Sequence, residues 1–399
     1  MDRVVKSNLL FAVLFLVVCS LPLLAIWTPG LNRGGALNEK RELAPWPDRS
    51  SLSLAQMPEA YEAWFNDHFG FRGLLVRMHG LFQYRVFNAS SSQLVLPGRD
   101  GWLFYDGRGV RGGDPRRNQL AQLPNAHERM FRELKEQFEH NDRYFAAQGI
   151  TYLVVIVPDK WSVYREMLPA AVGAPAPDTS ADLFLKYLRA ESDLKILDLK
   201  AALRDRRHER GPLYHQIDSH WNEWGAYVAA GEMARFAGRF DERVQPLAAE
   251  PQLTSGHRTH GDLAALLGLE GWLGEDEPRV QLIDPKGLEV TQLPVPANAS
   301  SDKRFPIHTS QQAPELPRAL ILRDSYADAL LPFFSRSFSE VRWVWTSNAR
   351  RGNLQPLVTE LQPDFVIEEK AEKYLMFPIR YYTAPGRSAV VVHPGRHKK

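Results

Sequence analysis

The sequence predicts an α/β fold with a mainly parallel β-sheet, and two observations support this prediction. Continuous apolar runs, such as residues 152–157, have the pattern of strands that are covered on both faces. Segments with helical apolar spacing alternate with these runs, which is the order typical of βαβ units. Strands are expected at 152–157, 194–197, 318–322, 341–345 and 365–367, and helices at 125–147, 180–190, 327–334 and 354–361.

The composition is that of an ordinary globular protein. With 399 residues, 44% of them hydrophobic and 24% charged, the chain can bury a sizeable core. The formal net charge of +2 gives no argument for a nucleic-acid partner, and we expect none. Because Cys19 is the only cysteine, internal disulfides and thiolate metal sites are excluded. His257 and His260 have no third ligand nearby, so we expect no metal there. We also expect no cofactor.

The N-terminal segment 8–27 carries no charged residue and is long enough to cross about 30 Å of hydrocarbon as a helix. We therefore expect an uncleaved signal that acts as a transmembrane anchor, with a short cytoplasmic tail at 1–7. Arg3 and Lys6 in this tail place the rest of the chain on the other side of the membrane. A cleaved signal peptide is the alternative, although Leu23-Leu24-Ala25 is a poor cleavage site. Residues 28–56, rich in Pro, Gly, Asn and charge, are expected to form a spacer.

The main domain is expected to span 57–399, with an insertion at 246–316. Two helices joined by a turn are predicted over 57–87, and a β-hairpin over 93–105. The insertion is rich in Pro, Gly, Thr and Ser and has one clear helical pattern, at 262–269. We expect the parallel sheet to close without the insertion, and the insertion to pack at the rim of the active site.

Two motifs offer the groups of a nucleophilic enzyme. Ser325 follows the strand at 318–322 and precedes a helix, where a serine hydroxyl is exposed at the carboxyl edge of a sheet. Asp218 and His220 lie two positions apart, so the carboxylate can hold one imidazole nitrogen while the other acts as a base. Helix capping is the alternative interpretation of both motifs. If the motifs act together, Ser325 and His220 should lie at neighbouring strand ends with their reacting atoms about 2.6–3.2 Å apart.

The order of the motifs resembles a known family. Asp218-Ser219-His220-Trp221, followed by Gly225-Ala226, and Arg323-Asp324-Ser325-Tyr326 are similar to signatures of SGNH hydrolase-like proteins of the alginate O-acetyltransferase type, AlgJ and AlgX. Further stretches of the chain agree with that family in the same order; they are 39–45, 65–72, 98–105, 158–164 and 261–263. About thirty residues follow the last strand, which leaves no room for a carbohydrate-binding module, so we expect the AlgJ-like layout.

The resemblance implies a three-layer SGNH hydrolase-like domain with Ser325 as nucleophile, His220 as general base and Asp218 as orienting acid. The implied activity is acetyl transfer to hydroxyls of an exported, alginate-like polysaccharide, with the catalytic domain in the periplasm and the anchor in the inner membrane. The implied partners are the polysaccharide acceptor and a membrane-bound O-acyltransferase that supplies acetyl groups. Arg323 departs from the glycine that many SGNH enzymes have, and Asn348 is one candidate for a side-chain oxyanion donor.

Substrate contacts are expected from five residues near the strand ends, namely Lys160, Tyr164, Trp221, Arg323 and Tyr326. The alternative interpretation places the aromatic rings in the core and pairs the cations with local carboxylates. Two other functions also remain open. One is a carbohydrate acetylesterase of the same fold, because water can resolve the same acyl-enzyme, and the other is a non-catalytic scaffold for polysaccharide export.

Overall fold

The structure is a computed structural model of the chain. It describes residues 2–27, 42–50, 52–106, 124–172, 178–244, 246–247, 251–283, 291–292, 307–310, 313–346 and 354–375.

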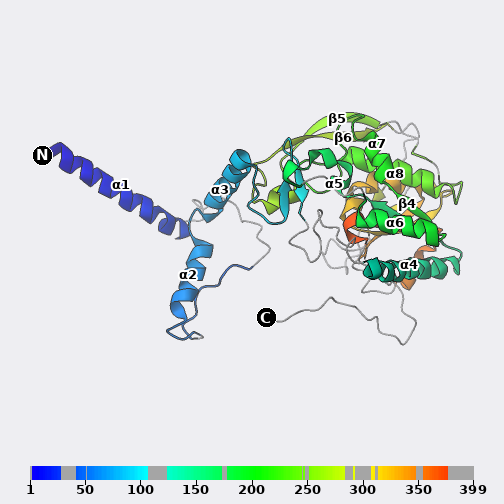
Figure 1. The fold of residues 1–399 in the computed structure, drawn as a ribbon, viewed down its shortest axis with the longest axis horizontal. Helices are drawn as coiled ribbons and strands as arrows, with labels where there is room; N and C mark the ends of the chain where they lie inside the picture. Colours follow the sequence, from blue (N-terminus) through cyan, green and yellow to red (C-terminus); the bar gives the residue numbers. More distant parts are fainter. Residues whose placement is uncertain are drawn as a thin grey trace.

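The N-terminal part of the chain is helical. Helix α1 (Asp2–Trp27) extends away from the part of the molecule that contains the sheet (Figure 1). Within the described residues, no helix combines the length and the apolar character that a membrane crossing needs. The two helices expected over 57–87 are present as α2 (Met57–His68) and α3 (Arg72–Phe87), and the turn between them includes Phe71 with a φ of 65°.

The predicted hairpin is confirmed. Strand β1 (Val95–Pro97) pairs in antiparallel register with β2 (Leu103–Tyr105). The tight connection uses two residues with positive φ, Asp100 at 52° and Gly101 at 82°. Such angles favour glycine and, among other residues, Asp and Asn. The short turn in the sequence therefore fixes where the two strands meet.

A seven-stranded sheet with the order β4-β3-β11-β9-β10-β8-β7 forms the centre of the domain. Neighbours among the first five strands pair in parallel, which confirms the predicted parallel sheet. These five strands are β3 (Thr151–Val157), β4 (Ile196–Asp198), β9 (Arg318–Arg323), β10 (Glu340–Trp345) and β11 (Phe365–Ala371). Although β11 is the last of the described strands in the sequence, it lies between β3 and β9.

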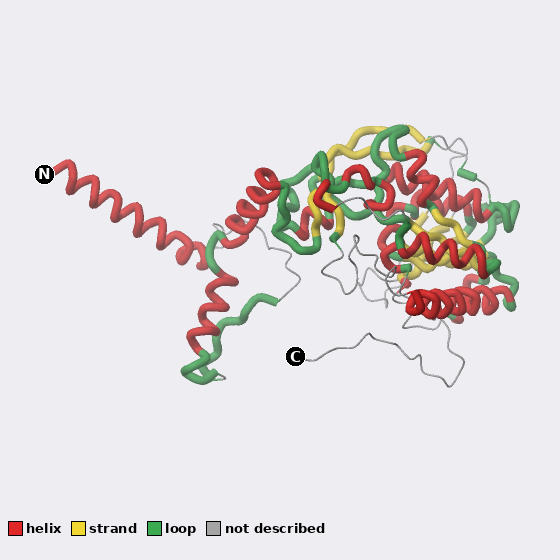
Figure 2. Tube along the Cα trace, in the orientation of Figure 1, coloured by secondary structure: helices red, strands yellow, loops and turns green. Residues whose placement is uncertain are grey.

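Helices cover both faces of this sheet, which gives three layers (Figure 2). Successive strand side chains point to opposite faces, so Val155 and Val157 join one hydrophobic cluster while Val154 and Ile156 join the other. The first face packs against α7 (Lys200–Arg206), α8 (Glu223–Ala237) and α10 (Leu331–Phe334). The second face packs against α4 (Pro124–Ala146), α6 (Ser180–Glu191) and α12 (Gln355–Leu361).

The helix expected at 327–334 is replaced by two short pieces, η5 (Ser325–Ala329) and α10. Pro332 lies in the first turn of α10, and a proline cannot donate the backbone hydrogen bond that a continuous helix would need. Four other short helical turns connect the larger elements; they are α5 (Lys160–Val163), η3 (Arg165–Met167), η4 (Ala170–Val172) and η6 (Ser335–Ser337). After β11 the described chain ends with η7 (Glu372–Tyr374).

The insertion at 246–316 adds elements to the edge of the domain. Strands β5 (Pro251–Arg258) and β6 (Glu275–Leu282) form an antiparallel ribbon, with α9 (Asp262–Leu266) between them in the sequence (Figure 1). Helix α9 is shorter than the predicted 262–269, because Gly268 turns the chain with a φ of 72°. Strands β7 (Thr291–Gln292) and β8 (Ile307–Ser310) extend the sheet beyond β10. The five parallel strands are contiguous without them.

Gly225 allows α8 to start close to the preceding chain. A Cβ atom at this position would lie 2.1 Å from the carbonyl oxygen of Leu213, far inside van der Waals contact. We expect Gly225→Ala to destabilise the protein by about 1–3 kcal/mol and to lower the Tm measured by thermal denaturation. Gly231→Ala in the same helix is the matched control, because its Cβ would meet only Arg235 Nη1, at 3.7 Å. The control should be neutral or stabilising by up to about 1 kcal/mol. A Gly225→Ala protein with the same Tm as Gly231→Ala would contradict the explanation that Gly225 leaves no room for a Cβ atom.

Candidate active site

Ser325 lies directly after β9, at the turn into η5. Asp324 fixes this turn, because its side chain accepts hydrogen bonds from the backbone N–H groups of Tyr326, at 2.9 Å, and Ala371, at 2.8 Å. The backbone N–H of Asp324 in turn donates to Glu369 Oε2 on β11, at 2.9 Å. Asp324 therefore caps the turn, and the partly exposed Ser325 hydroxyl is left for another contact.

The loop before α8 provides this contact. His220 Nε2 lies 2.7 Å from Ser325 Oγ, although the two residues are 105 positions apart. This distance lies within the range expected from the sequence, and His220 Nδ1 lies 2.7 Å from Asp218 Oδ1. Asn222, and not Asp218, caps α8, since its side chain accepts from the N–H of Gly225 at 3.0 Å. The three side chains form one hydrogen-bonded chain from carboxylate to hydroxyl.

Asp218 is held as a carboxylate. Burial by itself raises the pKa of this group, but hydrogen bonds and charge attraction from His220, together with the backbone N–H of Asp262, outweigh burial and lower the pKa well below its ordinary value. An ionised carboxylate can only accept hydrogen bonds, so the proton of the Asp218–His220 contact lies on Nδ1. His220 Nε2 is then free to accept the proton of Ser325.

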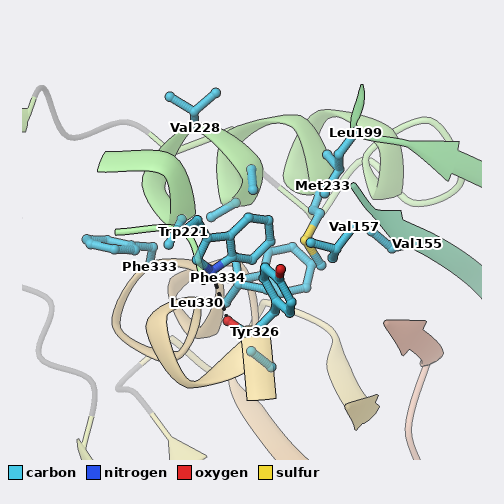
Figure 3. Close-up of a cluster of buried hydrophobic side chains, with 14 of the residues drawn as sticks. Val155, Val157, Leu199, Trp221, Val228, Met233, Tyr326, Leu330, Phe333 and Phe334 are labelled. Carbon is cyan, nitrogen blue, oxygen red and sulfur yellow. Dashed lines mark hydrogen bonds between the residues drawn. The ribbon is translucent and has the colours of Figure 1, made fainter. Parts of the chain in front are cut away.

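Three further side chains hold the loop that carries Asp218 and His220. Lys160 Nζ donates to the carbonyl oxygens of His215, Gln216 and Asp218 at 2.9, 3.0 and 2.6 Å. Tyr326 donates its hydroxyl proton to the carbonyl oxygen of Ser219 at 2.9 Å. Trp221 Nε1 donates to the carbonyl oxygen of Tyr326 at 2.9 Å, as the dashed line in Figure 3 shows. The loop is therefore attached both to the end of β3 and to the turn that carries Ser325.

All five residues expected to contact substrate lie in the interior, at 3% exposure or less. Burial lowers the pKa of Lys160 to about 7, although nearby carboxylates, first among them Asp218, oppose this shift. The Tyr164 hydroxyl donates to the carbonyl oxygen of Arg207 at 3.2 Å. Arg323 pairs with Asp328 and stacks on the ring of Trp345, 4.7 Å from its centroid. These side chains are buried among neighbouring parts of the chain, and their contact with substrate stays a prediction. Asn348 lies outside the described residues.

The structure also brings three side chains from the insertion to this loop, none of which the sequence indicated as site residues. Arg258 Nη2 donates to Asp218 Oδ2 at 3.2 Å. Asp262 accepts from the backbone N–H of Ser219 at 2.7 Å and from its hydroxyl at 2.5 Å. Glu275 accepts from the backbone N–H of Gln216. The stretch 261–263 agreed with the family pattern, which was a signal for Asp262. Nothing in the sequence pointed to Arg258 or Glu275.

Asp218, His220 and Asp262 each offer an atom that could bind a metal, and these atoms lie within 4.8 Å of one another. A metal on His220 Nδ1 would displace the Asp218 hydrogen bond that this nitrogen already makes. His257 and His260 do not share a site. His257 Nδ1 lies 2.8 Å from Asp276, whereas His260 Nδ1 lies 3.4 Å from Glu270. The arrangement at His220 therefore fits proton transfer better than metal ligation.

A buried carboxyl beside the site makes stability depend on pH. Burial raises the pKa of Asp159 from 3.8 to about 7, with Lys373 opposing and Glu372 adding to the increase. Between these two values the folded protein keeps a proton that the unfolded chain has lost, so the contribution of Asp159 to stability falls as the pH rises. The side chain of Asp159→Asn stays neutral at every pH. Between about pH 4 and pH 7 we therefore expect its free energy of unfolding to rise relative to that of the wild type, by up to about 4 kcal/mol in total. Urea unfolding at several pH values measures the difference, and parallel curves for the two proteins would contradict it.

Comparison with known proteins agrees with this geometry. Residues 95–302 match the family model described as "SGNH hydrolase-like domain, acetyltransferase AlgX". This range contains Asp218 and His220, whereas Ser325 lies beyond it. A protein named "Probable alginate O-acetylase AlgJ" from Pseudomonas syringae pv. tomato is 26% identical over 220 residues, which are 53% of this chain and 51% of that protein. The chain thus spans about half the length of this relative.

A longer alignment and a solved structure extend the comparison. The protein of the same name from Pseudomonas putida is 24% identical over 343 residues, which are 82% of each chain. The structure of Bacillus cereus PatB1 superposes with a TM-score of 0.52 at 17% identity, and the match covers 71% of this chain and 99% of PatB1. At that identity the superposition shows the fold. Because the family model matches just over half of the chain, the chain belongs to the AlgX-type acetyltransferase family of SGNH hydrolase-like domains.

Proposed function

We propose that the chain is an O-acetyltransferase that transfers acetyl groups to hydroxyls of an exported, alginate-like polysaccharide through an acyl-enzyme on Ser325. The observation that carries the proposal is the hydrogen-bonded chain from Asp218 through His220 to Ser325. A lone serine hydroxyl is a weak nucleophile, and a base at 2.7 Å that is itself oriented by a carboxylate is what activates it. The names of the AlgJ relatives support acetyl transfer and an alginate acceptor.

The proposed reaction has two half-reactions. In the first, His220 Nε2 takes the Ser325 proton while Oγ attacks the carbonyl carbon of the acetyl donor, and the leaving group departs with that proton. In the second, His220 takes the proton of a sugar hydroxyl, whose oxygen attacks the acetyl-serine and regenerates the Ser325 hydroxyl. Asp218 keeps its hydrogen bond to Nδ1 throughout and stabilises the imidazolium that forms in each step. The N–H of Ser325 at the start of η5 is the proposed donor to the oxyanion.

The location and the partners are also part of the proposal. We infer from the charge-free segment 8–27 that the chain is anchored in the inner membrane with its catalytic domain in the periplasm. A membrane-bound O-acyltransferase would then supply the acetyl groups. A reporter fused after Lys399 should be active in the periplasm, and the protein should fractionate with inner membrane. A reporter that is active only in the cytoplasm would contradict this placement.

One experiment separates the transferase from the other two candidate functions. The full chain is incubated with 4-nitrophenyl acetate, with and without alginate oligosaccharides, and acetylated sugar and released acetate are both measured. If the protein is a transferase, adding the acceptor should produce acetylated sugar and lower the amount of acetate released. Release of acetate that no acceptor diverts would indicate an esterase. Binding of the oligosaccharide without turnover of the ester would indicate a scaffold.

A further inference from the structure

Arg258, at the end of β5 in the insertion, reaches the carboxylate of the hydrogen-bonded chain. Its Nη2 lies 3.2 Å from Asp218 Oδ2, on the side of the carboxylate that faces away from His220. The Arg258 side chain is 29% exposed, and that of Asp218 is 8% exposed. The contact is therefore a largely buried ion pair, in which the guanidinium charge is less screened than at an open surface.

The direction of the Arg258 guanidinium is fixed on its other atoms. Nη1 lies 3.2 Å from His215 Nε2, and Nε donates to the carbonyl oxygen of His260. A guanidinium can only donate hydrogen bonds, so His215 Nε2 accepts and the ring carries its proton on Nδ1. Nδ1 faces Glu277 Oε2 at 2.8 Å. All three guanidinium nitrogens of Arg258 thus have separate partners, and only one of the partners is Asp218.

The carboxylate of Asp218 is saturated with donors. Oδ1 accepts from His220 Nδ1 at 2.7 Å and from the backbone N–H of His220 at 3.0 Å. Oδ2 accepts from Arg258 Nη2 and, at 3.1 Å, from the backbone N–H of Asp262. Without Arg258, Oδ2 would keep one donor, and the remaining charge of a buried carboxylate would be less compensated. The carboxyl group could then turn or take up a proton, and either change weakens its hold on His220.

We propose that Arg258 is a positioning residue for Asp218, so that the β5–β6 ribbon is a working part of the catalytic site. This inference rests on the proposed function for its catalytic consequence. The hydrogen bonds of Arg258 go to His215, Asp218 and His260, so it acts on His220 through Asp218. Its charge opposes protonation of the nearby imidazole, and its geometry keeps Asp218 directed at Nδ1.

A purely structural role, in which Arg258 only attaches the ribbon to the body, makes a different prediction. Loss of an attachment lowers stability and the amount of folded protein, but it leaves kcat per folded molecule unchanged. The other ionisable groups around the Asp218–His220 pair stay the same in every variant; they are Asp262, Lys160, Lys373, His215, Glu275 and Glu277. A change in the pH dependence of the rate can therefore be assigned to the charge of Arg258.

The test compares Arg258→Met, Arg258→Lys and a matched control, Arg243→Met, in the full chain. Arg243 also bridges two aspartates, Asp241 at 2.6 Å and Asp364 at 2.7 Å. Asp364 accepts from Arg318 N at the start of β9, so Arg243 lies at the sheet edge opposite to Ser325, about 20 Å away along six residues of strand. The control should keep kcat within about twofold of the wild type.

For Arg258→Met we expect kcat to fall about 10- to 100-fold with little change in KM, because a carboxylate that is no longer held misplaces the base. The acid limb of the rate profile should move to higher pH by about one unit, because a cation that opposed imidazole protonation is gone. Arg258→Lys keeps the charge but not the three-way geometry, so its acid limb should stay in place while kcat falls less. A twofold or smaller effect of Arg258→Met, or a lower kcat with an unmoved acid limb, would overturn the proposal.

A second readout does not depend on turnover. The proton between Asp218 and His220 should give a far-downfield NMR resonance that His220→Ala removes. In Arg258→Met this resonance should shift or broaden, and the pH at which the imidazole changes state should rise, while Arg243→Met leaves both unchanged. If the wild type shows no acetyl chemistry, the proposed function fails, yet this measurement still decides the role of Arg258. A resonance that Arg258→Met leaves unchanged would overturn it.

Discussion

Ser325→Ala is expected to remove nearly all acetyl transfer, with kcat reduced by about 10⁴- to 10⁶-fold. The substitution deletes the oxygen that His220 Nε2 contacts at 2.7 Å, and no acyl-enzyme can form without it. The turn should survive, because Asp324 caps it through the backbone N–H groups of Tyr326 and Ala371. Formation of acetylated oligosaccharide from 4-nitrophenyl acetate, followed by mass spectrometry, measures the loss.

Two companion variants sharpen this result. Ser337→Ala removes a buried hydroxyl from η6, which precedes β10 at the opposite edge of the sheet from Ser325, and should leave kcat within about twofold. The double variant Ser325→Ala/His220→Ala should be little worse than either single variant, because groups that act as one unit are not additive. A Ser325→Ala protein that still acetylates its acceptor would eliminate the acyl-enzyme proposal.

Asp218→Asn is expected to lower kcat by about 10²- to 10⁴-fold, less than Ser325→Ala. The Asn amide keeps the size of the side chain, but its NH₂ group would face His220 Nδ1, which must then accept. The ring proton moves to Nε2 and points at Ser325, where it cannot act as a base. Because His220 is then present but in the wrong tautomer, we expect kcat to fall while KM changes little. The same assay measures both.

Asp241→Asn is the matched control for this change. Asp241 is paired with Arg243 much as Asp218 is paired with Arg258, yet it lies on the far side of the domain. Its amide variant should lose at most about 1 kcal/mol of stability and no activity. Equal rates for Asp218→Asn and the wild type, at equal amounts of folded protein, would show that His220 needs no orienting acid.

The strands were predictable where apolar side chains cover both faces, as in β3 and β9. The end of β11 was not predictable, because the pattern ended at residue 367 whereas the strand continues through Glu368, Glu369 and Lys370. These charged residues are buried at 3% exposure or less, and some of their partners come from distant parts of the chain, such as the Tyr152 hydroxyl at 2.5 Å from Glu368 Oε2. Local hydropathy cannot anticipate such partners. Strands β7 and β8 were missed for a related reason, because they are short and lie in a polar insertion.

The residues of the candidate site also fall into those that the sequence could predict and those that it could not. Asp218 and His220 are close in sequence and Ser325 follows a strand, so local pattern and the parallel topology together brought them to one edge. Arg258 contacts Asp218 from 40 positions away through a ribbon that leaves no distinctive pattern. The sequence did not reveal that the five residues expected to contact substrate are buried, because side chains that follow parallel strands can point inward as well as outward. Sequence fixes their position along the chain but not their direction.

The central position of β11 has a consequence for how the domain assembles. Strands β3 and β4 lie on one side of β11, and β9, β10, β8 and β7 lie on the other, so until residues 365–371 join, the sheet consists of two separate halves with open edges. The turn that carries Ser325 can form fully only after β11 has joined the sheet, because Asp324 accepts a hydrogen bond from the N–H of Ala371 at the end of that strand. A chain still being synthesised would thus carry all three reactive side chains without a working site. The site can therefore act only after β11 has joined the sheet, and the same step closes two exposed strand edges that are prone to pair with other chains.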